Sequence, residues 1–294
     1  NGKINLYGGT VTSLFVDKGS LNITGINVTV ENGINVGKKA GNVNISAGTI
    51  KGDVTIADEA KSKVTISGGS FEDNEAIKDY LPSGSALLQK PDGTYEIVAG
   101  LLKIGDTYYP TLDAAFKAAA DGATIELINQ EGAVIAMNGS LYGKSVTITG
   151  TAKVDWSKGF LFVGRGGEGN ATVTFDGANL TSASDNASTG IHVSGREKGT
   201  NNKYDGTVVI KNSTIVLDYL INKGAMTLDN ATLTVKNGCA IGGRPASETE
   251  SGQDATATIS LTNASKFVVN DHNGMGLGYE AIGVMNIGAT STFE

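Results

Sequence analysis

The sequence predicts an all-β chain in which short parallel strands stack into coils, a parallel β-helix (β-solenoid) with about three strands per coil. Composition and two repeated phrases support this fold class. The chain has 294 residues, of which 41 are Gly and only 4 are Pro, while aromatic residues make up 6%. Abundant Gly together with Val, Ile, Thr and Asn favours strands joined by tight turns. The hydrophobic fraction of 39% is enough for a packed core.

The first phrase reads apolar, any, apolar, any, Gly or Asn, small, any, apolar. Its ten copies begin at Ile4, Leu21, Val43, Val64, Val146, Val173, Val208, Met226, Ile259 and Met285. Their fifth positions hold Gly8, Gly25, Ala47, Gly68, Gly150, Gly177, Asn212, Asn230, Asn263 and Ala289. Gly and Asn tolerate positive φ, so each copy is expected to form a strand, a corner and a second strand. The variable spacing of the copies suits a coil of about 18 residues that carries loops of differing length.

A second phrase falls between copies and predicts the third strand of each coil: "FLFVGRG" near 160, "GIHVSGR" near 190, "YLINKG" near 219 and "CAIGGRP" near 239. With these phrases the chain resembles the pectate-lyase-like right-handed parallel β-helices. In particular it is similar to the Gly/Thr/Asn-rich repeat segments of large bacterial cell-surface, adhesin-like proteins. The resemblance covers most of the chain. It implies a right-handed coil and an extracellular or cell-surface location in a bacterium, and it carries over no catalytic residue.

The repeat stops between Glu72 and Glu131. There we expect a short helix over 73–81, a hairpin over 86–98 with Pro-Asp-Gly at its turn, and an amphipathic helix over about 111–121 that Thr111 caps and Gly122 ends. Residues 1–98 would then be the C-terminal part of a first β-helix with its helix–hairpin cap. Residues 99–294 would be a second β-helix with an N-terminal capping helix. The alternative is one continuous solenoid with an insertion. Both ends of the chain lie in strand-like phrases, so a piece of a longer protein is expected.

Charge and residue counts exclude several classes of site. The net charge of −7 argues against a nucleic-acid partner, and no apolar run reaches the length of a membrane span. The single cysteine, Cys239, is expected to be a buried apolar group. His192 is expected on the outer face of a strand and His272 in a loop, and neither has the neighbours that zinc requires. We therefore expect no metal and no other cofactor.

Two glycine-rich stretches are similar to nucleotide-binding loops, "GRGGEG" at 164–169 and "GSLYGKS" at 139–145. Each runs into a strand phrase and not into a helix, so the phosphate site that such loops form at a helix N-terminus is rejected. Among the acids, Asp176 and Asp229 hold the same phrase position in coils separated by one that carries Lys211. They are either solvated corner residues or a paired-carboxylate glycosidase site.

Four basic residues, Arg165, Arg196, Lys223 and Arg244, each follow a predicted third strand. In a stack they would form a basic column, and the longest insertions leave from the same corner. In repeat proteins such insertions gather on one face, which is often the binding face. With Tyr204 in one insertion, this column is a candidate site for the carboxylate or sulfate groups of an acidic glycan. The alternative is a solvated row neutralised by Glu168, Glu197 and Glu248.

The sequence thus favours a non-enzymatic, secreted surface protein of the adhesin type, which presents a loop-bearing face to host or microbial glycans or to a surface protein. Two alternatives stay open. One is a carbohydrate-active β-helix enzyme, either a polysaccharide lyase or a glycoside hydrolase. The other is a passive structural stalk without a ligand.

Overall fold

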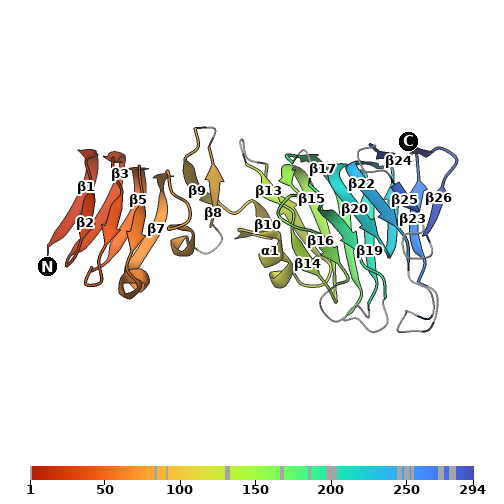
Figure 1. Cartoon of the computed structure of the whole chain (residues 1–294), viewed down its shortest axis with the longest axis horizontal. Helices are drawn as coiled ribbons and strands as arrows, with labels where there is room; N and C mark the ends of the chain where they lie inside the picture. Colours follow the sequence, from red (N-terminus) through yellow and green to blue (C-terminus); the bar gives the residue numbers. More distant parts are fainter. Residues whose placement is uncertain are drawn as a thin grey trace. The chain divides into compact units, whose positions relative to one another are not determined.

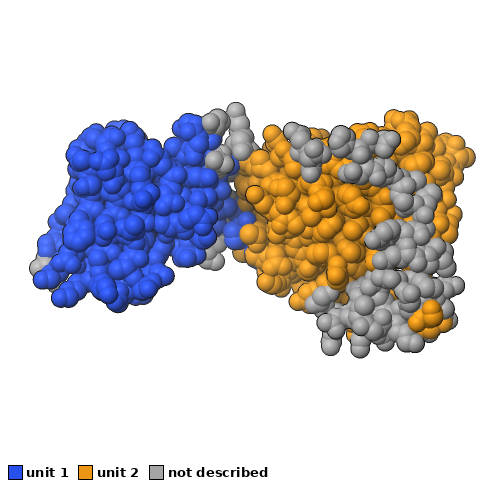
Figure 2. Space-filling model, in the orientation of Figure 1, with its two compact units in different colours: residues 1–100, 108–110 blue, residues 101–107, 111–294 orange. Residues whose placement is uncertain are grey.

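The computed structural model describes residues 2–82, 85–90, 92–129, 133–165, 169–184, 187–196, 204–243, 247, 252, 255–270, 275–277 and 283–294. The chain forms two compact units, residues 1–100 with 108–110 (unit 1) and residues 101–107 with 111–294 (unit 2), which Figure 2 colours separately. Both units consist mainly of strands that run side by side in the same direction (Figure 1). The predicted all-β class with parallel strands is confirmed.

Unit 1 contains two parallel ladders of strands. The longer ladder is formed by β1 (Lys3–Val11), β3 (Ser20–Val30), β5 (Val43–Ile50) and β7 (Val64–Phe71). The shorter ladder is formed by β2 (Leu14–Val16), β4 (Ile34–Val36) and β6 (Val54–Ile56). The register shifts in the middle of each long strand, which divides it into two segments. Each repeat therefore supplies three strand segments, as the phrases predict. A short 3-10 helix, Asp58–Lys63, follows β6.

Unit 2 contains three parallel ladders. The first is formed by β12 (Ala123–Leu127), the N-terminal halves of β15 (Ser145–Asp155) and β17 (Ala171–Ser182), β19 (Gly206–Lys211), β21 (Ala225–Asp229), β23 (Ala257–Thr262) and β26 (Gly283–Ile287). The second is formed by β13 (Ile135–Ala136), the C-terminal halves of β15 and β17, the N-terminal halves of β20 (Thr214–Asn222) and β22 (Thr232–Ile241), β24 (Lys266–Val269) and β27 (Thr292–Phe293). The third is formed by β14 (Gly139–Leu141), β16 (Leu161–Val163), β18 (Gly190–Val193), the C-terminal halves of β20 and β22, and β25 (Met275–Leu277). This pairing is compatible with a β-solenoid.

The core of each unit is made by inward side chains that stand above one another in register. In the first ladder of unit 2, one such row is Ile125, Ile148, Phe175, Ile210, Leu228 and Leu261, all buried. In unit 1 the matching row is Ile23, Ile45 and Ile66. Burying one such side chain contributes about 1.5–3 kcal/mol. A slip of one residue would turn every member of a row to solvent, so the alternation of the phrase fixes the register.

The predicted corners differ between the two units. In unit 2 the fifth phrase position has positive φ at Gly150, Gly177, Asn212, Asn230 and Asn263, as expected. In unit 1 positive φ falls one residue later, at Gly9, Gly48 and Gly69. At Gly68 the glycine allows close approach instead, because a Cβ there would lie 2.3 Å from the carbonyl oxygen of Ser46 on the neighbouring repeat. The expectation of positive φ at the fifth position is therefore wrong for unit 1.

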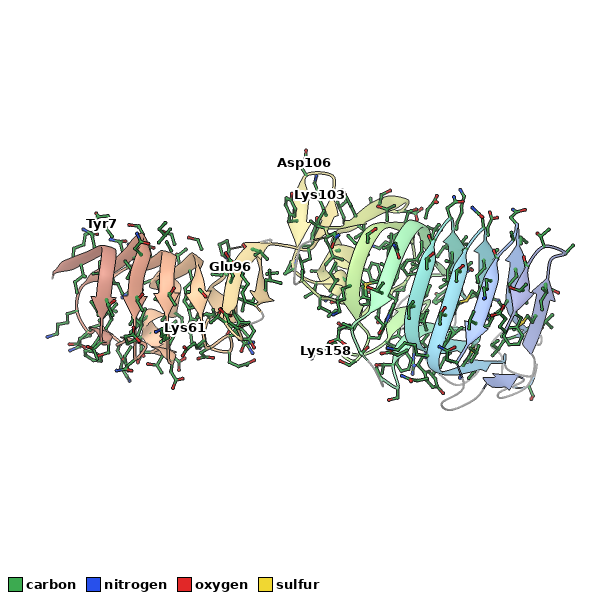
Figure 3. The ribbon with its side chains drawn as sticks, turned by 90° about the horizontal axis from the view of Figure 1, so that it is seen from above. Tyr7, Lys61, Glu96, Lys103, Asp106 and Lys158 are labelled. Carbon is green, nitrogen blue, oxygen red and sulfur yellow. The ribbon has the colours of Figure 1, made fainter. Side chains whose placement is uncertain are left out.

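Antiparallel strands cover one ladder edge in each unit. The predicted hairpin is confirmed as β8 (Ser85–Gln89) and β9 (Tyr95–Ala99), and β9 pairs antiparallel with the end of β7. In unit 2, β10 (Leu102–Ile104) pairs antiparallel with β12. β11 (Thr107–Tyr109) follows β10 in the chain, and its last two residues belong to unit 1. Figure 3 labels Lys103 and Asp106 around this connection. Reversing the strand direction ends a ladder that would otherwise present free N–H and C=O groups to another parallel strand.

The predicted amphipathic helix is present as α1 (Leu112–Ala118), and the side chain of Thr111 accepts a hydrogen bond from the backbone N–H of Ala114, as expected of its N-cap. The helix ends earlier than predicted, because Ala119 is already extended. Lys144 Nζ donates to the carbonyl oxygens of Phe116 and Ala119, at 2.9 and 2.6 Å. The lysine of the rejected nucleotide-loop phrase thus binds the C-terminal end of α1.

The predicted helix over 73–81 is reduced to a single 3-10 turn, Lys78–Tyr80. Asp73 Oδ1 accepts a hydrogen bond from the backbone N–H of Glu75. This contact is the kind an N-cap residue makes, but no α-helix follows it.

We predict that the unit 2 corners depend on the left-handed conformation that asparagine tolerates. Asn230 has φ 50°, and its Nδ2 donates to Asn212 Oδ1 at 3.0 Å. Asn230→Ala removes this bond and strains the corner, so it should lower the free energy of unfolding by about 2 kcal/mol in urea titrations. Asn230→Gly should cost less, because glycine relieves the strain.

The matched control is Asn179→Ala, which makes the same substitution at an exposed strand position. It should change the free energy of unfolding by less than about 0.5 kcal/mol. Equal losses for the alanine and glycine variants of Asn230 would contradict a role for the backbone conformation.

Candidate functional site

The predicted basic column lies at the C-terminal end of the third ladder of unit 2. There Val163, Val193 and Asn222 are in register. Arg165 follows this level by two residues, Arg196 by three and Lys223 by one. The three residues leave adjacent strands from one corner, but they do not share one register position. Arg244 lies outside the described residues, as do Glu168, Glu197 and Glu248, which the alternative interpretation invoked.

Arg165 lies over an aromatic cluster. Its Cζ is 4.9 Å from the centroid of the Phe162 ring, and the Arg165 side chain is exposed. The Phe162 ring lies 5.5 Å from that of Phe160 and 5.2 Å from that of His192, which faces it in register on β18. We call Phe160, Phe162, Arg165 and His192 the aromatic–basic patch. A cation over an aromatic ring is stabilised by about 0.5–1 kcal/mol at an exposed site.

His192 lies on the outer face of β18, as predicted, but it is only 8% exposed and packs against the two phenylalanine rings. This cluster was not predicted from the sequence. The signal that could have revealed it is the matched phrase position of Phe162 in "LFV" and His192 in "IHV", because outward residues of adjacent coils must lie next to one another.

The charge of Arg196 is balanced by Asp205, which was not predicted from the sequence. Its Nε lies 2.9 Å from Oδ2 of Asp205, so the two form an ion pair. The Nε–H makes no hydrogen bond within the described part of the chain, and neither does the buried hydroxyl of Ser194. Asp205 is itself positioned by its backbone N–H, which donates to Asn170 Oδ1 at 2.9 Å. Tyr204 and Lys223 are half-buried.

Asp176 and Asp229, the two acids of the first ladder, form contacts that join adjacent repeats. Asp176, Lys211 and Asp229 stand in register, and Lys211 Nζ lies 3.5 Å from Asp176 Oδ2. Asn212 Nδ2 donates to Asp176 Oδ1, and Asn263 Nδ2 donates to Asp229 Oδ1 at 2.6 Å. The two carboxylates are separated by two strand spacings of about 4.8 Å each, with a lysine between them.

A buried acid lies where β20 passes from the second ladder to the third. Asp218 is 0% exposed and accepts hydrogen bonds from Ser182 Oγ, at 3.0 Å, and from Ser184 Oγ. Lys236 Nζ lies 3.1 Å from Asp218 Oδ1. This cluster was not predicted from the sequence. Its hydrogen bonds compensate the cost of removing the carboxylate from water.

The remaining candidate residues do not gather into a reactive site. Cys239 is 3% exposed, as predicted, and burial raises the pKa of its thiol to about 12. No three His, Cys, Asp or Glu side chains of the described ranges lie together as a metal ion would require. His272 lies outside those ranges. None of the helices that the structure describes has the length and apolar character needed to cross a bilayer.

Comparison of the chain with protein-family models, with curated proteins and with solved structures finds no match.

We predict that Cys239 is inert towards thiol reagents while unit 2 is folded. At pH 8 a thiol with a pKa of about 12 is about 0.01% thiolate, against roughly 10% for one at its ordinary value of 9.0. Labelling with a disulfide reagent should therefore be about a thousandfold slower in buffer than in denaturant. Because the pKa is raised on folding, stability should fall as the pH rises from about 9 towards 12. Rapid labelling of the folded chain at pH 8 would contradict the burial of Cys239.

We predict that Lys236→Met destabilises unit 2 by about 3 kcal/mol, because it leaves the buried carboxylate of Asp218 without its cation. The double variant Asp218→Asn with Lys236→Met should recover part of this loss. Lys211→Met is the matched control, since its ion pair with Asp176 is solvent-exposed and should contribute less than about 1 kcal/mol. Urea titration of the three variants gives the comparison. Equal losses for the two single variants would show that burial of Asp218 does not matter.

Proposed function

We propose that the chain is a non-enzymatic, adhesin-like repeat protein of the bacterial cell surface, built as two right-handed parallel β-helical units. Its outer face would bind an acidic glycan. The observation that carries this proposal is the exposed Arg165 held over the Phe162 ring beside His192. The three strand segments per repeat and their parallel pairing support the solenoid part of the proposal.

The chemistry of the aromatic–basic patch suits a sugar that carries a carboxylate. A guanidinium that lies over a ring keeps N–H groups at its edge, and these can bind a carboxylate bidentately. Aromatic rings beside it offer an apolar surface to the C–H groups of a pyranose. The strands that carry the patch are fixed by backbone bonds to the coils on both sides, so little conformational entropy would be lost on binding.

Three acids of unit 2 are engaged in contacts within the fold, which supports binding more than catalysis. Asp205 forms an ion pair with Arg196, and Asp176 and Asp229 hold neighbouring coils together. A hydrolase would need two carboxylates that face one substrate bond. The two alternatives, a lyase or hydrolase and a passive stalk without a ligand, are possible outcomes of the experiment that follows.

We predict selective binding of the chain to uronic or sialylated glycans on an array that also carries sulfated and neutral sugars. Arg165→Ala should weaken binding by about tenfold or more, and Arg165→Lys should recover little of it, because lysine lacks the bidentate fork. Lys153→Ala is the matched control, since Lys153 is an exposed basic residue of β15 outside the patch.

Three results would overturn the proposal. Absence of binding to every acidic glycan would leave a protein-binding surface or a bare stalk. Binding that Arg165→Ala does not weaken would place the site elsewhere. Release of product from a polysaccharide panel would indicate an enzyme.

A further inference from the structure

A groove of about 540 Å³ lies on the outer face of the shorter ladder of unit 1, formed by β2, β4 and β6. The side chains that matter in it are Phe15, Asp17, Asn35, Lys38, Lys39 and Thr55. The groove belongs to unit 1, whereas the aromatic–basic patch belongs to unit 2. Every residue that lines it is described, and the function proposed above does not use it.

The alternation of three short strands builds this groove. Their first and last residues are apolar and face the core of unit 1, as Ile34 and Val36 do on β4. The middle residues Phe15, Asn35 and Thr55 stand in register on the opposite face. They therefore follow one another at intervals of about 4.8 Å. Phe15 is 68% exposed, so its ring is open to solvent at this surface.

The backbone N–H and C=O groups of the ladder already form hydrogen bonds between adjacent repeats, which limits what the groove can bind. Leu14 N–H donates to the carbonyl oxygen of Gly33, and Ile34 N–H donates to that of Asp53. β4 is paired on both sides. A peptide cannot add as a further strand to this face, so recognition must come from the outward side chains.

The positive and negative charges of the side chains that line the groove are balanced. Lys38 Nζ lies 3.2 Å from Glu59 Oε1, and both side chains are exposed. Asp17 and Lys39 then contribute one negative and one positive charge. A strongly charged ligand would gain little here. Phe15 is the one largely exposed apolar side chain of the lining, which gives a protein partner little of the apolar area that stable interfaces bury.

An exposed aromatic ring beside an amide, a hydroxyl, a carboxylate and an ammonium group is suited to a polyhydroxylated ligand. The ring can stack on the C–H face of a pyranose. Asn35 and Thr55 offer donors and acceptors for sugar hydroxyls, and Asp17 offers acceptors. The register of the three strands places these groups in a row, which fits an extended chain of sugar units.

The same phrase builds the third-strand face in both units. Residues 14–18 read Leu-Phe-Val-Asp-Lys, and residues 161–165 read Leu-Phe-Val-Gly-Arg. In each phrase the aromatic residue is the middle one of a three-residue strand. The surroundings differ in charge, since Phe162 lies under the exposed Arg165 whereas Phe15 lies in a groove without excess charge.

We propose that the groove over β2, β4 and β6 is a carbohydrate-binding site for an uncharged oligosaccharide, with Phe15 as its stacking platform. The site is separate from the acidic-glycan site proposed for unit 2, and either can exist without the other.

The experiment is isothermal titration of the full chain with neutral tri- to hexasaccharides of hexose and N-acetylhexosamine units, chosen from an array. Phe15→Ala should weaken binding by about tenfold or more, and Phe15→Tyr should retain it, because tyrosine keeps the ring face. Tyr7→Ala is the matched control. Tyr7 is another exposed aromatic residue of the first repeat of unit 1, it projects away from the strand in Figure 3, and it does not line the groove.

Arg165→Ala should leave binding of the neutral oligosaccharide unchanged, which separates this site from the one in unit 2. Phe15 is largely exposed, so its alanine variant should keep the circular dichroism spectrum of the parent chain. Failure of every neutral oligosaccharide to bind would overturn the proposal. So would binding that Phe15→Ala leaves intact, or binding that Tyr7→Ala weakens as much.

Discussion

The register of the parallel ladders is the constraint on which the other features of both units depend. Each repeat is joined to the next by backbone hydrogen bonds, and every inward row of apolar side chains exists because the strands of adjacent repeats align residue by residue. The same register also fixes which outward side chains lie next to one another. Phe162 contacts His192, and Asn22 donates to Asn5 at 2.8 Å, because the strands that carry them are aligned. Because the core fixes the register, it also fixes the arrangement of these outward side chains and makes the face rigid.

Polar side chains at the corners and between ladders maintain this register where the apolar rows end. Ser213 Oγ donates to the carbonyl oxygen of Lys211 and accepts the N–H of Ala178 on the coil before. Ser265 repeats the arrangement with Thr262 and Ala231. A corner would otherwise leave backbone groups without partners away from water. Small hydroxyl residues after the turn asparagine thus supply hydrogen-bond partners for the backbone groups of the corner, and they join two adjacent repeats.

The sequence predicted the periodic and local features well and the contacts between distant residues poorly. The repeated phrases located the parallel strands, while local turn and capping signals and residue type predicted the hairpin at β8 and β9, the capping of α1 by Thr111 and the burial of Cys239. The Asp218–Lys236 pair and the partner of Arg196 were not predicted. Asp218 and Lys236 lie on adjacent repeats, and their approach depends on the register shift between β20 and β22, whereas Arg196 and Asp205 flank the insertion between β18 and β19. Arg165, Arg196 and Lys223 each follow a strand of the third ladder, but their unequal offsets from one register level could not be predicted from the sequence.

The separation between inward and outward positions explains how one architecture can carry different surfaces. Leu14 and Val16 face the core as Leu161 and Val163 do, so these positions are restricted to apolar residues. The residue between them and those just after the strand are not restricted in this way, and they differ in charge between the units. Lys38 is balanced by Glu59 in unit 1, whereas Arg165 lies over Phe162 and is exposed in unit 2. Because the fold does not require these outward side chains, the outer face of either unit can change its chemistry without any change in the core.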